Sequence, residues 1–65
     1  MAVFFRVIED EGGGWDCSSG RTQFDHHDDY DNAFAHICLI AAESAPAEVI
    51  VHRRNEPPTT LATFD

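Results

Sequence analysis

The sequence predicts a small α+β domain, with a two-layer ββαββ order in which one helix packs on one face of a small antiparallel sheet. Three observations lead to this prediction. Short runs of β-branched and aromatic residues lie near both ends of the chain. A segment between them has apolar residues at helical spacing. At 65 residues the chain has room for one hydrophobic core, so we expect a single domain over residues 1–65.

Two strands are predicted before the helix, at residues 3–9 and 15–24. The first run is β-branched and aromatic, and it alternates between two faces. The glycines at 12–14 permit a hairpin turn, because glycine adopts positive φ without a steric penalty. The second run contains Ser-Ser-Gly at 18–20, which predicts a bulge within one continuous strand.

The helix is predicted over residues 30–45, with Asp29 as the N-cap. A carboxylate at this position accepts a hydrogen bond from an unpaired backbone N–H and favours the positive end of the helix dipole. The helix ends before Pro46, since the residue before proline avoids the helical region. The apolar stripe consists mainly of Tyr30, Ala33, Phe34, Ile37, Cys38, Ile40 and Ala41.

Two further strands are predicted at 48–54 and 60–64, joined by a turn around Pro57 and Pro58. One helix covers only one face of a sheet. The other face would keep apolar side chains exposed, and such a patch typically marks an interface. We therefore predict a homodimer whose interface contains Phe4, Ile8, Ile50, His52 and Arg54.

Charge is the strongest compositional signal. Twelve acidic residues face four arginines, the chain has no lysine, and the formal net charge is −8. Nucleic acid and anionic membrane surfaces would be repelled, whereas a basic protein or a divalent cation would be attracted. The chain shows no apolar run of membrane-spanning length and no signal peptide, so we expect a cytoplasmic protein. Cys17 and Cys38 are too few for a disulfide scaffold, and we expect two free, buried thiols.

The segment from Asp25 to Asp31 concentrates the residues with metal-ligand chemistry. His26, His27 and Asp28 are the candidate ligands for zinc, nickel or manganese. The alternative is a capped helix start with solvated histidines. His36 lies too far along the helix to join them simply.

The sequence offers little support for an enzyme. His52 could act as a base only beside a nucleophile such as Cys17; the alternative is a packed or interface histidine paired with Glu48 or Asp16. The glycines at 12–14 do not precede a helix, so they do not predict a phosphate-binding loop. We predict no catalytic residue and no cofactor.

The chain resembles domain of unknown function 2188, a family of small uncharacterised bacterial proteins. The matching pieces are Gly14-Trp15, Asp28-Asp29 leading to Ala33, Ala41-Ala42, and Ala47 to His52. The resemblance spans about residues 4–64 and implies this fold without any established activity. The start of the chain also resembles antitoxin domains of the HicB type, without their DNA-binding tail.

We therefore predict an acidic, homodimeric interaction or structural domain. Two alternatives stay open. One is an antitoxin-like or inhibitory module that binds a basic protein. The other is a metal or small-ligand binder that uses the segment from Asp25 to Asp31.

Overall fold

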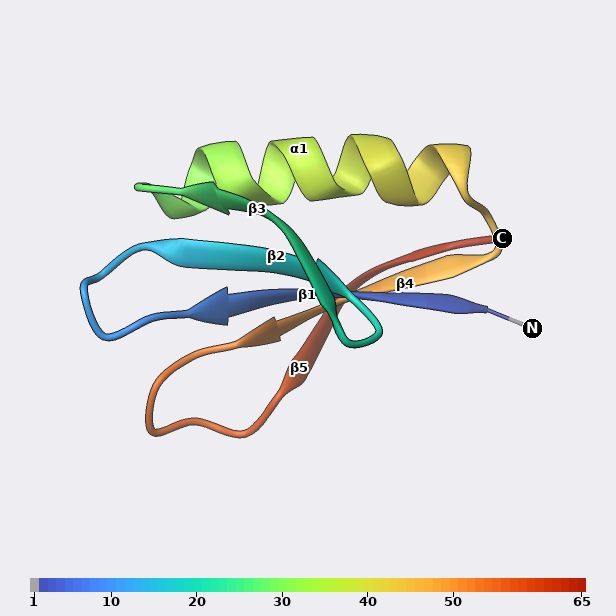
Figure 1. Ribbon diagram of the computed structural model, residues 1–65. Coiled ribbons are helices and arrows are strands. Elements are labelled where there is room, and N and C mark those ends of the chain that lie inside the picture. Colours follow the sequence, from blue (N-terminus) through green and yellow to red (C-terminus); the bar gives the residue numbers. More distant parts are fainter. Residues whose placement is uncertain (1) are drawn as a thin grey trace.

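The computed structural model describes residues 2–65, and it contains one helix packed against a five-stranded sheet (Figure 1). This agrees with the predicted α+β class, but three strands precede the helix and two follow it. The elements in chain order are β1 (Val3–Glu9), β2 (Trp15–Ser19), β3 (Thr22–His27), α1 (Tyr30–Glu43), β4 (Ala47–His52) and β5 (Thr59–Phe64).

The predicted strand over residues 15–24 is in fact two strands. β2 and β3 pair antiparallel, and Ser19 pairs with Thr22 across a two-residue turn. Gly20 opens this turn with φ 61°, the left-handed conformation that tight hairpins require and glycine adopts most readily. The expected bulge is present, but it lies on β3, where Phe24 is the extra residue opposite Cys17 and Ser18.

The additional strand changes the sheet from the predicted antiparallel type to a mixed one. Each successive strand of a hairpin runs opposite to the strand before it. With three strands before the helix in place of the predicted two, β4 therefore runs in the opposite direction to the one predicted. β4 pairs parallel to β1, while the other neighbouring pairs are antiparallel. The strand order is β3-β2-β1-β4-β5. The segment α1 therefore connects the β3 edge of the sheet to a strand on the far side of β1.

The helix begins and ends close to where the sequence predicted. Asp29 is the N-cap, and its Oδ1 accepts a hydrogen bond of 2.8 Å from the backbone N–H of Asn32. The last helical residue is Glu43, two residues before the predicted end, and Ser44 is the C-cap. The peptide bond between Ala45 and Pro46 is cis.

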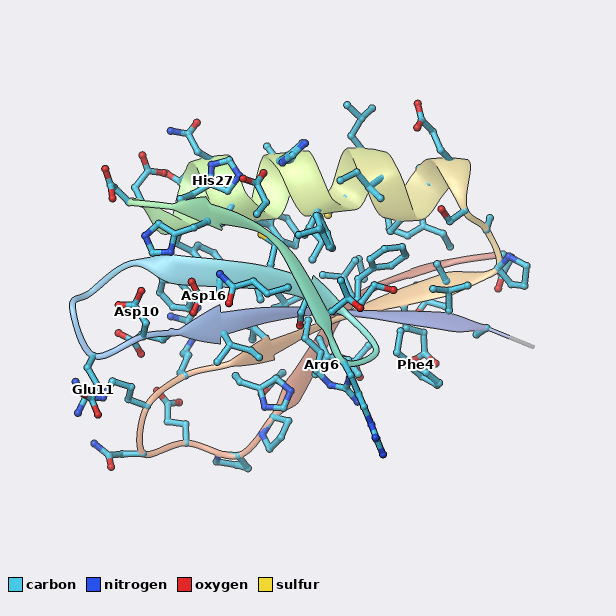
Figure 2. All side chains as sticks on the ribbon, viewed as in Figure 1. Phe4, Arg6, Asp10, Glu11, Asp16 and His27 are labelled. Atoms are coloured by element: carbon cyan, nitrogen blue, oxygen red, sulfur yellow. The ribbon has the colours of Figure 1, made fainter. Side chains whose placement is uncertain are left out.

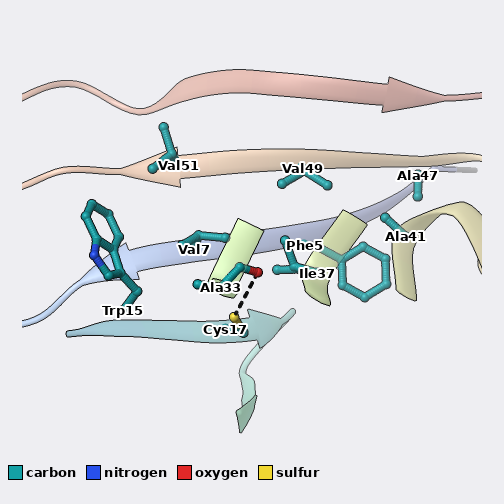
Figure 3. Packing of buried hydrophobic residues seen from close by; sticks show 10 residues of the cluster. All are labelled: Phe5, Val7, Trp15, Cys17, Ala33, Ile37, Ala41, Ala47, Val49 and Val51. Carbon is teal, nitrogen blue, oxygen red and sulfur yellow. Dashed lines mark hydrogen bonds between the residues drawn. The ribbon is translucent and has the colours of Figure 1, made fainter. Parts of the chain in front are cut away.

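The hydrophobic core lies between α1 and one face of the sheet (Figure 3). Helix positions 33, 37 and 41 are fully buried, as expected for residues four apart on one side of a helix. Alternate residues of β1, β2 and β4 meet them from the sheet. The buried apolar residues are Phe5, Val7, Trp15, Cys17, Ala33, Ile37, Ala41, Ala47, Val49 and Val51.

Candidate functional site

The sheet face opposite α1 has no covering layer among the described residues. Because side chains alternate along a strand, Phe4, Arg6 and Ile8 of β1 point away from the helix. Figure 2 shows Phe4 and Arg6 on that side of the sheet, and His27 beside the helix. Phe4 is 44% exposed and Ile8 is 36% exposed. We call this surface the open face.

The neighbouring strands add apolar and charged side chains to the open face. In the parallel register of β1 and β4, Phe4 lies beside Glu48, Arg6 beside Ile50, and Ile8 beside His52. On the other side of β1, Ile8 lies opposite Asp16. The open face therefore combines three apolar residues with charges of both signs.

Two of the predicted interface residues, Arg54 and His52, have local surroundings that the sequence did not predict. The backbone N–H of Arg54 donates a hydrogen bond of 2.9 Å to Oε1 of Glu9, which joins the ends of β1 and β4. The Nε2 atom of His52 is buried and has no hydrogen-bond partner among the described residues, so neither Glu48 nor Asp16 pairs with it.

A second feature, on the helix side of the sheet, brings together Asp25, His27 and His36. Asp25 and His27 are two residues apart on β3, so both side chains point toward α1. The chain then reverses within two residues, and α1 runs back along β3 (Figure 1). This reversal carries His36 over the strand. We call these three residues the DHH cluster.

The DHH cluster converges on one carboxylate oxygen. Oδ2 of Asp25 lies 2.9 Å from Nε2 of His27 and 2.5 Å from Nδ1 of His36, and the two nitrogens are 3.2 Å apart. The other oxygen, Oδ1, accepts a hydrogen bond of 2.8 Å from the backbone N–H of His26. This backbone bond, followed by the bond and charge of His27, lowers the pKa of Asp25. All three side chains are partly exposed.

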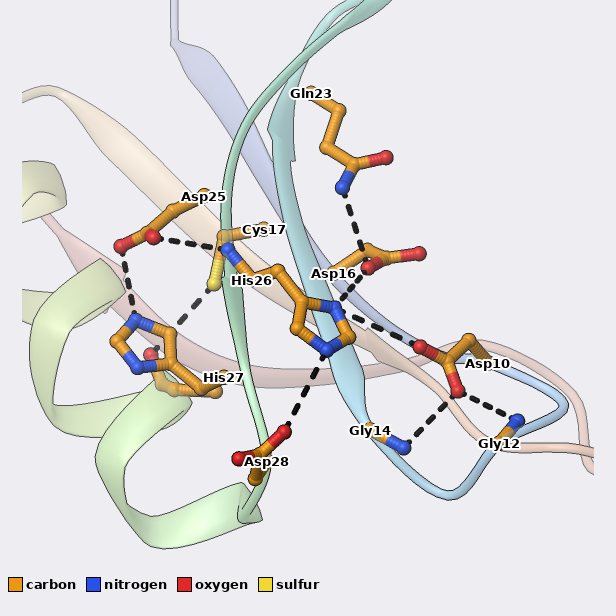
Figure 4. A network of polar contacts seen from close by, with 11 residues as sticks. Asp10, Gly12, Gly14, Asp16, Cys17, Gln23, Asp25, His26, His27 and Asp28 are labelled. Atoms are coloured by element: carbon orange, nitrogen blue, oxygen red, sulfur yellow. Dashed lines mark hydrogen bonds and ion pairs between the residues drawn. The ribbon is translucent and has the colours of Figure 1, made fainter.

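His26 belongs to a different set of contacts, on the other side of β3 (Figure 4). Its Nδ1 lies 2.6 Å from Oδ1 of Asp16 and 3.6 Å from Oδ2 of Asp10, while its Nε2 lies 3.8 Å from Asp28. The hydrogen bond to Asp16 is the main reason that the pKa of His26 is raised above 6.5. Oδ1 of Asp10 also accepts from the backbone N–H groups of residues 12 and 14, so these contacts hold the β1–β2 turn against β3.

The structure thus divides the three predicted metal ligands between two places. His26 and His27 are adjacent in an extended strand, so their side chains point to opposite faces. His26 and Asp28 lie near each other, and His27 lies with Asp25 and His36 instead. The expectation that His36 lies too far away is wrong. The predicted strand ended at residue 24, whereas β3 extends to His27.

The structure does not bring together the other residues considered for catalysis. Cys17 is fully buried on the helix side, whereas His52 belongs to the open face. Burial is the main cause that raises the pKa of the Cys17 thiol to about 11, which disfavours the nucleophilic thiolate. Cys17 and Cys38 are both free thiols, as expected, but only Cys17 is buried, whereas Cys38 is partly exposed. The guanidinium of Arg53 packs over the rings of Trp15 and Tyr30, at 5.6 and 5.0 Å from the ring centroids.

Comparisons with protein-family models, curated proteins and solved structures found no match to this chain. The resemblance to domain of unknown function 2188 therefore stays a prediction. The one helix described over residues 2–65, α1, lacks the length and apolarity needed to cross a bilayer. The same residues form no detected pocket, so the open face and the DHH cluster are surface features.

Proposed function

We propose that this protein is a small interaction domain that self-associates through the open face. The observation that carries the proposal is the one-sided core. All of the buried apolar strand residues face α1, while Phe4 and Ile8 on the opposite side remain 44% and 36% exposed. Burial of apolar surface contributes about 25 cal/mol per Å², so covering this face would stabilise a chain whose own core is thin.

The charges of the open face favour a second copy as the partner. In a two-fold symmetric dimer the same patch meets itself, so a charge on one copy must find an opposite charge on the other. The open face supplies Arg6 together with Glu48. This mixture can pair with itself, although the net charge of −8 repels two copies elsewhere and makes the association salt-dependent.

The test is light scattering after size exclusion, at several protein concentrations and two salt concentrations. We expect a dimer for the wild-type chain, and a folded monomer for Ile8→Glu because the acid cannot be desolvated in an apolar contact. Leu39→Glu is the matched control. It makes the same kind of change at the most exposed large apolar side chain, 62% exposed on the helix, and should leave the dimer intact.

Three results would contradict the proposal. A wild-type monomer at about 100 µM would exclude a stable dimer. Equal effects of the two variants would place the contact away from the open face. A heterodimer that forms with a basic protein and excludes the homodimer would favour the inhibitory-module alternative.

A further inference from the structure

The DHH cluster contains two imidazoles and one carboxylate with their ligand atoms turned toward a common point. We propose that Asp25 Oδ2, His27 Nε2 and His36 Nδ1 form a binding site for one divalent transition-metal ion, and that Zn²⁺ suits it best. This inference is independent of the self-association proposed above, because the cluster lies on the helix side of the sheet.

The distances within the cluster suit a small ion with nitrogen and oxygen ligands. Zinc binds imidazole nitrogen and carboxylate oxygen at about 2.0–2.2 Å, and in a tetrahedron this places ligand atoms about 3.3 Å apart. The three separations are 2.5, 2.9 and 3.2 Å. Shifts of less than about 1 Å would therefore open the cluster to tetrahedral spacing, and partly exposed imidazoles can make such shifts by side-chain rotation.

The donor types exclude the common alkaline-earth ions. Ca²⁺ and Mg²⁺ require mostly oxygen ligands, whereas two imidazoles favour zinc, copper or nickel. The carboxylate of Asp25 is also oriented for metal binding. The backbone N–H of His26 holds Oδ1 of Asp25, which orients Oδ2 toward the imidazoles, and such outer contacts commonly orient metal ligands. Three protein ligands leave a fourth coordination position for water or another small ligand.

The second cluster on β3 serves as a comparison. Asp10, Asp16 and His26 also bring three ligand atoms together, but they include only one imidazole. Carboxylate oxygens therefore predominate there, and oxygen ligands suit magnesium, calcium or manganese better than zinc. We therefore expect zinc binding at the DHH cluster and not at this one.

The experiment is a Zn²⁺ titration against a chromophoric chelator, on protein first stripped of metal, at pH 7.5. We expect one Zn²⁺ per chain with a dissociation constant in the micromolar range or tighter. His36→Ala should weaken binding at least about a hundredfold, since loss of an outer-sphere contact alone weakens binding by about 10–100-fold. His26→Ala is the matched control, because alanine keeps the backbone N–H that holds Oδ1 of Asp25 and removes only a ring on the opposite face of β3. It should leave the affinity within about twofold.

A second measurement identifies the ligand set directly. Co²⁺ in place of Zn²⁺ should give the visible absorption of a tetrahedral ion without a thiolate charge-transfer band, because neither Cys17 nor Cys38 belongs to the DHH cluster. Circular dichroism of each metal-free variant establishes that it is folded. The monomeric Ile8→Glu variant should bind Zn²⁺ with unchanged affinity, since all three ligands come from one chain.

Several outcomes would overturn the proposal. Equal weakening in His36→Ala and His26→Ala would indicate adventitious surface binding. Zn²⁺ binding weaker than about 1 mM would show that the cluster is a hydrogen-bonded triad only. Loss of binding in Ile8→Glu would show that the site is not complete within one chain, while leaving the dimer itself established.

Discussion

At the scale of single residues, the alternation of β3 decides the chemistry of its histidines. His26 and His27 are neighbours in sequence, yet one pairs with Asp16 and the other with Asp25. Gly14 contributes to this arrangement. A Cβ atom at Gly14 would lie 2.6 Å from Cε1 of His26, so the ring occupies space that only glycine leaves open. The hydrogen bond between His26 and Asp16 therefore depends on a residue in the turn between β1 and β2.

We predict that Gly14→Ala lowers the pKa of His26 toward its ordinary value of 6.5, because the new methyl group displaces the ring from Asp16. The measurement is an NMR titration of the histidine ring protons in EDTA. Gly12→Ala is the control, since its Cβ would make an ordinary contact of 3.4 Å with Asp10. An unchanged pKa of His26 in Gly14→Ala would contradict this explanation.

The same pKa has a defined effect on stability. A histidine whose pKa is raised in the folded state contributes stabilisation that is fully present below pH 6.5 and is lost as the pH rises through the folded-state pKa. The wild type should therefore lose unfolding free energy over this interval relative to Gly14→Ala. Asp10 and Asp28 also face His26, so part of the dependence should remain in the variant.

At the scale of elements, the helix start determines where His36 lies. Asp29 accepts hydrogen bonds from the backbone N–H and the side-chain Nδ2 of Asn32, each at 2.8 Å. From Tyr30 to His36 the helix advances by about 9 Å, and from His27 back to Asp25 the strand covers about 7 Å. These similar lengths, run in opposite directions, explain why His36 returns to the level of Asp25.

We predict that Asp29→Ala destabilises the protein by about 1 kcal/mol, the typical cost of losing an N-cap. Urea denaturation followed by circular dichroism measures this change. Asp28→Ala is the control, because it removes the same charge one residue earlier from a side chain that is fully exposed. Its effect should stay within about 0.5 kcal/mol. Equal losses in both variants would show that charge, not capping, stabilises the helix start.

At the scale of the whole molecule, one helix and one sheet face provide the core. Ile37 is fully buried in the middle of this layer, between Ala33 and Ala41 on the same helix. A chain of 65 residues typically has an unfolding free energy of about 3 to 10 kcal/mol. Loss of one central side chain should therefore remove a large share of the stability.

We predict that Ile37→Ala lowers the unfolding free energy by about 2–5 kcal/mol, because it removes buried methyl groups and leaves a cavity. Thermal and urea denaturation measure the change. Leu39→Ala lies two residues further along the same helix at a 62% exposed position and should change stability by less than about 0.5 kcal/mol. Comparable losses at the two positions would mean that α1 does not pack as described.

Local patterns in the sequence were sufficient for the helix and most strands. The Asp29 cap, the stripe through Ile37 and the first strand at 3–9 follow from capping chemistry and side-chain periodicity, which depend on neighbouring residues only. The division of residues 15–24 was missed. Gly20 is equally consistent with a bulge or with a turn, and the choice depends on whether Ser19 and Thr22 pair with each other.

The candidate site could also be predicted only in part from the sequence. The spacing of Asp25 and His27 already predicts a shared face if the segment is a strand, and their residue types already indicate metal chemistry.

By itself, the sequence determined the α+β class, the acidic charge, the capped helix and the side of the helix that is buried, since each depends on residues within a few positions of one another. Only the tertiary structure decided the mixed sheet, the exposure of Phe4 and Ile8 on one surface, and the meeting of His36 with Asp25. These features join segments that are distant in sequence. Strand pairing and the reversal between β3 and α1 fix the positions of these segments, and no local sequence pattern predicts either one.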